Sequence, residues 1–170
     1  RKDIFLEIDV MQDRHLVPSA VGDVIRAFSN SPVKNPNGPP GISLHVFQDE
    51  TNLPLQNFTN AMRDFQLSKR RHFGSVTDRG ATNAQAILHA RARVFRYSVL
   101  GNYYGSTLSS GFADLPGDDF MVTLGPPRPN QALDGQLQGA TILHEMGHTL
   151  GLFHGGGQID WNDDRRYNHK

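Results

Sequence analysis

The fold of this chain is decided by the eleven residues His144–His154, which read HEMGHTLGLFH. Histidines four positions apart lie on the same face of a helix, so His144 and His148 can bind one metal ion. Gly151 can adopt the left-handed conformation that ends a helix, and the chain can then return with His154 as a third ligand. Three protein ligands with one position left for water are typical of a catalytic zinc site. The pattern therefore predicts a helix that carries a hydrolytic metal centre.

Glu145 directly follows the first of these histidines. A carboxylate in this position can act as the general base that removes a proton from water. The chain has only three glutamates and eight histidines, and the short stretch holds one of the former and three of the latter. We therefore expect Zn²⁺ as the cofactor, Glu145 as the catalytic residue, and a ligand set made of His144, His148 and His154.

The helix that carries the motif is expected to run from Asp134, a residue type that caps helices, to Leu150. Apolar side chains recur in it at helical spacing and are expected to bury against a sheet. This face consists of Ile142, Leu143, Met146 and Leu150. The opposite face is expected to border a cleft, and it consists of Thr141, His144, Glu145 and His148.

The extended motif resembles that of the metzincin clan of zinc endopeptidases. Three further segments are similar to strands of the secreted microbial members and follow in the same order, namely Asp3–Asp9, Gly41–Phe47 and Asp119–Gly125. The resemblance spans most of the 170 residues. It implies one α/β (α+β) catalytic domain over residues 1–170, with a mixed, twisted sheet. It also implies a secreted enzyme that hydrolyses polypeptide substrates.

The same resemblance implies where a substrate binds. In such enzymes the peptide lies extended along an edge strand above the zinc and pairs with it through main-chain hydrogen bonds. The matching residues of this chain are Ser109, Ser110, Gly111, Phe112 and Ala113.

The chain departs from the clan pattern after the third histidine. Metzincins have a methionine-containing turn there, which forms an apolar floor beneath the metal ligands. The sixteen residues after His154 contain no methionine, and Met146 lies inside the predicted helix. We expect the native polypeptide to continue beyond Lys170, with the turn in later sequence or on a separate C-terminal fragment that stays associated. The alternative is that the protein manages without this turn.

The composition fits one globular domain. Seventeen Lys and Arg balance 17 Asp and Glu, so neither nucleic acid nor an anionic membrane surface is an expected partner. No apolar run approaches the length of a membrane span. The absence of cysteine excludes disulfides and thiolate metal sites. Because the sequence starts at Arg1 without a signal-like segment, we expect a processed, mature form.

Periodicity predicts the remaining elements. Strands are expected at 4–10, 42–48, 94–99, 108–113 and 120–124. Helices are expected at 17–28 and 81–93, and a loop at 30–41, which is rich in proline and asparagine. Periodicity is weak from 50 to 80 and predicts irregular structure with one short helix near 58–66.

Three aspartates, Asp114, Asp118 and Asp119, surround a glycine turn. Carboxylates in such a turn can bind calcium through their oxygens, whereas turn conformation alone also accounts for aspartate at these positions. Both interpretations stay open.

Two alternatives to an active endopeptidase also stay open. One is a metal-binding pseudo-protease fragment without activity, which fits the missing methionine turn but leaves the intact Glu145 unused. The other is a zinc hydrolase that acts on a different bond. The bare HExxH core admits it, but Gly151 and His154 favour peptide bonds.

Overall fold

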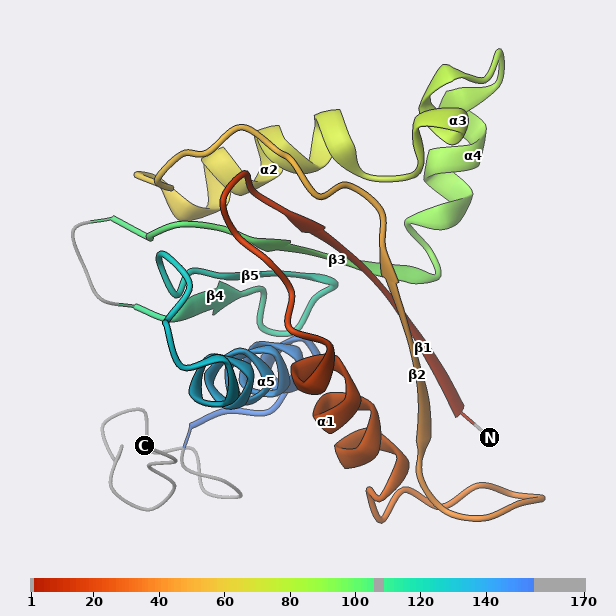
Figure 1. The fold of residues 1–170 in the computed structure, drawn as a ribbon. Coiled ribbons are helices and arrows are strands. Elements are labelled where there is room, and N and C mark those ends of the chain that lie inside the picture. Colours follow the sequence, from red (N-terminus) through yellow and green to blue (C-terminus); the bar gives the residue numbers. More distant parts are fainter. Residues whose placement is uncertain (1, 106–108, 155–170) are drawn as a thin grey trace.

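The computed structural model describes residues 2–105 and 109–154, and these form a five-stranded sheet with helices on both faces (Figure 1). The strand order is β2-β1-β3-β5-β4, and all neighbours are parallel except the antiparallel pair β4 and β5. The strands are β1 Lys2–Val10, β2 Ile42–Gln48, β3 Phe95–Leu100, β4 Gly111–Ala113 and β5 Asp119–Val122. The helices are α1 Pro18–Ser29, α2 Ala61–His72, α3 Val76–Gly80, α4 Ala84–Arg91 and α5 Gln131–Thr149. The expected α/β architecture with a mixed sheet is confirmed.

Two hydrophobic cores form on the two faces of the sheet, because successive side chains of a strand point to opposite sides. On one face, alternate residues of β1 pack with α1 and α5, and Ile8 and Val10 are fully buried there. On the other face, Tyr97, Val99 and Met121 pack with α2. The sheet therefore separates α2 from the helix that carries the histidine motif.

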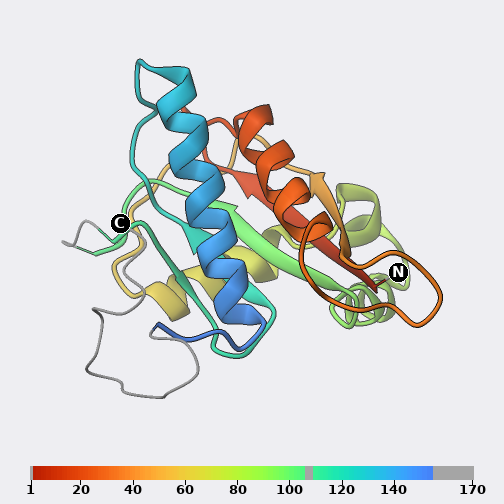
Figure 2. The ribbon, with the colours of Figure 1, turned by 90° about the horizontal axis from the view of Figure 1, so that it is seen from below.

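α1 and α5 lie side by side on the first face (Figure 2). Gln138 of α5 links them, since its Oε1 accepts from the main-chain nitrogen of Val17 at 2.9 Å. Its Nε2 donates to the main-chain oxygen of His15 at 3.1 Å and to Asp134 at 2.9 Å. These bonds satisfy the buried amide and anchor α5 about two turns before the motif.

α5 begins one turn earlier than the sequence predicted. Asn130 is the N-cap, and its side-chain oxygen accepts from the main-chain nitrogens of Ala132 and Leu133 at 3.1 and 3.2 Å. The prediction of Asp134 as the N-cap is wrong, because Asp134 is buried inside the helix. There its carboxylate accepts from Gln138 instead of from the helix end.

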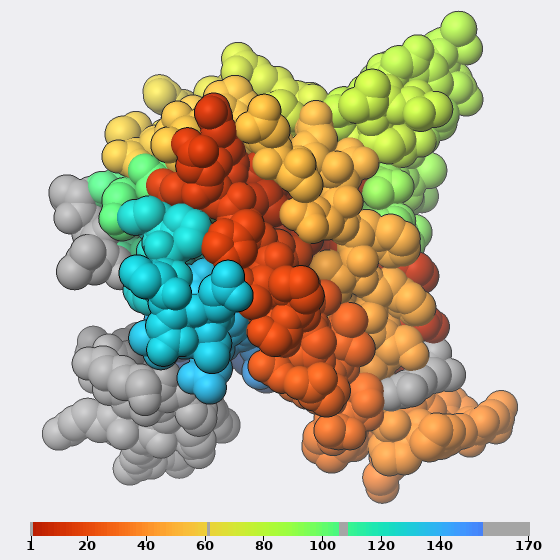
Figure 3. Space-filling view, in the orientation of Figure 1, coloured from red at the N-terminus to blue at the C-terminus, as the bar shows by residue number. Residues whose placement is uncertain are grey.

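The prediction for residues 50–80 is confirmed only in part, because α2 overlaps the short helix expected near 58–66 but extends to His72, and α3 was not expected. Asn60 caps α2 by accepting from the main-chain nitrogen of Arg63 at 3.2 Å. Ser75 and Asp78 form a capping box at the start of α3. Local capping therefore defines helices whose apolar periodicity is weak. The space-filling view shows the α3–α4 region projecting from the body of the molecule (Figure 3).

The other predicted elements are confirmed to within a few residues, except that the strand expected at 108–113 is reduced to β4 and its residue 108 lies outside the described residues. Loop 30–41 contains no helix or strand. None of the helices in the described ranges is both long and apolar enough to cross a membrane.

Candidate metal centre

Three histidine nitrogens converge at the C-terminal end of α5. The Nε2 atoms of His144, His148 and His154 form a triangle with sides of 3.0, 3.1 and 3.1 Å. The centre of such a triangle lies about 1.8 Å from each corner, so one ion about 1 Å from its plane can reach all three at a zinc–nitrogen distance of roughly 2.0–2.1 Å. Three imidazole nitrogens that face one another also bring their lone pairs close together, and a bound cation would offset the repulsion between them. The residues present therefore fit a single metal ion.

The ring of His148 is oriented by its other nitrogen. Its Nδ1 lies 2.7 Å from the main-chain oxygen of Leu152, which can only accept a hydrogen bond. The proton of a neutral ring must therefore be on Nδ1, and the lone pair on Nε2 points into the triangle. A ligand histidine commonly has such a second partner, which fixes both its tautomer and its orientation.

The chain turns back after α5 through a Schellman motif. The main-chain nitrogen of Leu152 donates to the oxygen of Gly147 at 2.9 Å, and that of Gly151 donates to His148 at 2.8 Å. Gly151 has a φ of +84°, a left-handed conformation that side chains disfavour. The turn lets His154 approach the two helical histidines, as the spacing of the motif predicted.

Glu145 directly follows His144 but lies on the buried side of α5. Its side chain is only 5% exposed, and burial raises the pKa of its carboxyl to about 7. Within residues 2–105 and 109–154, no hydrogen bond joins this carboxylate to another protein group. A buried carboxylate that has no hydrogen-bond partner among the described residues is suited to exchange a proton with a small ligand.

The two faces of α5 differ from the prediction in four side chains. Ile142 and Met146 are buried, as expected, but Leu143 and Leu150 are about two-fifths exposed, at 40% and 41%. Conversely, Thr141 and Glu145 are buried. The reason is that β4 and β5 both pack on α5, so its buried stripe is rotated towards the edge of the sheet.

The edge strand predicted to receive substrate lies next to this site. β4 ends the strand order, so no strand within the described ranges pairs with its outer side. The main-chain groups of Ser110 and Asp114 face inward. Thr123 N donates to Ser110 O at 2.7 Å, and Asp114 N donates to Asp119 O of β5 at 3.0 Å. Because inward and outward groups alternate along an antiparallel strand, the main-chain groups of Gly111 and Ala113 face outward.

The remaining residues of the predicted substrate segment have other roles. Ser109 lies before β4, where its hydroxyl donates to the main-chain oxygen of Gly111 at 2.9 Å. The side chain of Phe112 points to the α2 face, where its ring is 6.2 Å from that of Tyr104. The open edge is therefore formed by two residues of the five.

A second group of metal-type ligands, which sequence reasoning missed, lies on the α2 face. It consists of Glu7, Asp9 and Asp49. Each carboxylate oxygen of the two buried members already accepts a hydrogen bond. The donors are Gly74 N at 2.7 Å and Arg91 Nε at 2.8 Å for Glu7, and Glu50 N at 2.9 Å and Tyr97 OH at 2.8 Å for Asp9. This group is a structural network that joins β1 to the outer helices.

The predicted calcium turn is built around an ion pair. Asp119 accepts from Lys69 at 2.5 Å and from Gln66 at 3.1 Å, so its two oxygens are engaged by α2. Burial raises the pKa of Asp114, and the charge of Asp119 adds to this effect. Calcium at this turn stays a prediction.

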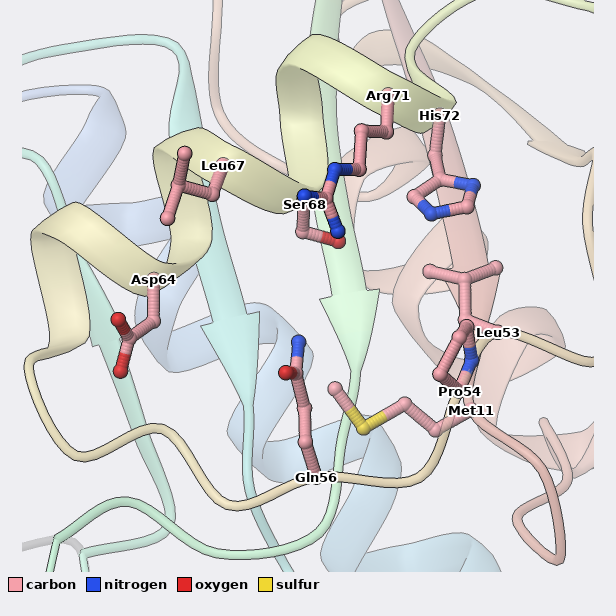
Figure 4. Close-up of a pocket in the computed structure, with 9 residues that line it drawn as sticks. All are labelled: Met11, Leu53, Pro54, Gln56, Asp64, Leu67, Ser68, Arg71 and His72. Carbon is pink, nitrogen blue, oxygen red and sulfur yellow. The ribbon is translucent and has the colours of Figure 1, made fainter.

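A cavity of about 100 Å³ lies between α2 and the chain around Leu53 (Figure 4). Ser68, Arg71 and His72 contribute polar groups to its lining. It is on the opposite face of the sheet from α5, so it is separate from the histidine triangle.

Comparisons with models of protein families, with curated proteins and with solved structures found no match for this chain.

Proposed function

We propose that this chain is the catalytic domain of a zinc-dependent endopeptidase of the metzincin type. The observation that carries the proposal is the convergence of three Nε2 atoms within 3.1 Å of one another, two of them on the helix in which the buried Glu145 directly follows His144. A site that only binds metal has no need for a buried carboxylate that follows the first ligand and has no hydrogen-bond partner among the described residues.

His144, His148 and His154 would hold the zinc ion, which when bound would act as a Lewis acid on a scissile carbonyl and lower the pKa of water. Glu145 then removes a proton from the attacking water as the oxygen–carbon bond forms. When the carbon–nitrogen bond breaks, Glu145 returns that proton to the departing amine. In the metal-free protein, burial raises the pKa of this carboxyl to about 7, close to the ambient pH at which a general base works best.

The open edge of β4 suggests how a polypeptide binds. An extended peptide can add to a free sheet edge through main-chain hydrogen bonds, which depend little on side-chain identity. The outward groups of Gly111 and Ala113 are the donors and acceptors for such pairing. Since Gly111 also lies against Glu145, a peptide bound there passes close to the general base.

The test is cleavage of an unfolded protein by the purified chain, before and after zinc removal with a chelator. We expect cleavage to stop on chelation and to return when zinc is added. Glu145→Ala should retain zinc and lose nearly all cleavage, whereas His148→Ala should lose both. His89→Ala is the matched control, because His89 is an exposed residue of α4.

The outcomes separate the alternatives. Stoichiometric zinc without cleavage of any unfolded protein would identify a metal-binding domain without activity. Cleavage of esters but not of peptides would identify a different hydrolase. Full activity of Glu145→Ala would remove Glu145 from the mechanism.

A further inference from the structure

A side chain at Gly111 of β4 would point at the carboxylate of Glu145. A Cβ atom at position 111 would lie 2.6 Å from Oε1 and 2.8 Å from Cδ of Glu145. Carbon and oxygen atoms that do not bond to each other normally remain well over 3 Å apart. The carboxylate therefore occupies the space that any side chain at position 111 would need.

The glycine is not required by the backbone. Gly111 is not among the glycines with a positive φ, and strands generally favour residues other than glycine. Close approach is the remaining physical reason for glycine here, because a strand accepts glycine where another group must come near its main chain.

We propose that Gly111 is a positioning residue that sets where the Glu145 carboxylate lies relative to the peptide-binding edge. The edge strand then has two functions at one residue. Its outward main-chain groups bind the substrate. The absence of a side chain leaves the space that the carboxylate of Glu145 occupies. This inference rests on the proposed peptidase function for its kinetic part, but the placement of the carboxylate can be tested without activity.

Gly111→Ala is the direct test. To regain a contact of 3.4 Å, the carboxylate must move by about 0.8 Å, and misplacement of a catalytic group by about 1 Å can cost two orders of magnitude in rate. We expect kcat to fall by about 10- to 100-fold, while zinc content is retained and KM changes much less. Gly80→Ala is the control, because a Cβ at Gly80 meets nothing within 4 Å.

The same Cβ would also lie 2.6 Å from the main-chain oxygen of Met121, so the variant presses β4 away from β5 as well. A double-mutant cycle with Glu145→Asp separates the two effects. Aspartate is one methylene shorter and withdraws the carboxylate from position 111. In that background Gly111→Ala should lower kcat by a clearly smaller factor than in the wild-type background, because only the contact with Met121 persists. An equal loss of kcat in both backgrounds would overturn the proposal.

Two measurements do not depend on activity. In the wild-type protein, nuclear Overhauser contacts are expected between the α-hydrogens of Gly111 and the γ-hydrogens of Glu145. In a crystal structure of zinc-loaded Gly111→Ala, the Glu145 carboxylate should be displaced while the three histidines stay in place. Absent contacts, or an undisplaced carboxylate, would refute the positioning role. A wild-type protein without peptidase activity would instead refute the proposed function and leave these two measurements valid.

Discussion

The main-chain oxygen of Leu152 lies 2.7 Å from Nδ1 of His148, so the loop that follows α5 orients a histidine of the helix that precedes it. The same loop delivers His154 two residues later. Orientation of the second predicted ligand and delivery of the third therefore depend on one conformation of this loop. We expect metal binding and closure of this helix end to be coupled.

Zinc stoichiometry tests the ligand set. The purified chain should bind one zinc ion through three imidazole nitrogens at roughly 2.0–2.1 Å, because the Nε2 triangle matches this distance. X-ray absorption spectroscopy measures both the number and the distances. His154→Ala should reduce the histidine count to two and weaken zinc binding, whereas His89→Ala should change neither. Three histidines still bound in His154→Ala would contradict the assignment.

Gly151 and Gly147 form a matched pair with opposite expected effects on stability. Gly151→Ala forces a side chain into a left-handed conformation and should cost about 1–2 kcal/mol, although a Cβ there meets nothing within 4 Å. Gly147 lies inside the helix, and the methyl group of Gly147→Ala would make an ordinary contact of 3.5 Å with Leu152. This substitution should raise the free energy of unfolding by about 0.5–1 kcal/mol. Urea unfolding measures both, and Gly151→Ala should also weaken zinc binding. Equal effects of the two substitutions would exclude the turn as the cause.

Titration of Glu145 should appear in the stability of the metal-free protein. Burial raises the pKa of Glu145 from 4.5 to about 7, so the folded state binds this proton more tightly than the unfolded state does. The resulting stabilisation is complete below pH 4.5 and is lost as the pH rises through 7. Relative to Glu145→Gln, which does not titrate, the metal-free wild type should lose up to about 3 kcal/mol across this range. Urea unfolding in chelator at acidic and basic pH measures it, and a constant difference would contradict the prediction.

Tyr97→Phe tests the buried network on the α2 face. The variant leaves an oxygen of the buried Asp9 without its donor, which should lower the unfolding free energy by about 1–3 kcal/mol. Burial raises the pKa of Asp9, and loss of the tyrosine hydrogen bond should raise it further. The deficit should therefore shrink as the pH falls and Asp9 becomes protonated. Tyr103→Phe is the control, because Tyr103 is 37% exposed.

The sequence alone predicted the part of the candidate site whose residues are close together in the chain. Gly151 and His154 follow the helical histidines within six residues, so their spacing alone predicted the convergence that the structure contains. The strands of the central sheet were also predictable, because β1 and β2 carry apolar residues in regular patterns.

The rest depends on contacts between distant segments. Glu7 and Asp9 alternate with apolar residues of β1, a pattern typical of a strand with one solvent face, yet both are fully buried. Arg91, 84 residues from Glu7, lies in the outer helical layer that covers them. Gly111 gives no signal either, since its function comes from the absence of a side chain beside Glu145.

Among the described residues the sheet ends in two edge strands, β2 and β4, which carry unequal risks of self-association. β2 offers seven residues, whereas β4 offers three and is followed at once by Asp114 and Pro116. A charge and a proline beside a short edge discourage strands of other copies from stacking there. The edge beside the histidines can thus remain exposed to extended chains in solution without nucleating aggregates of the protein itself.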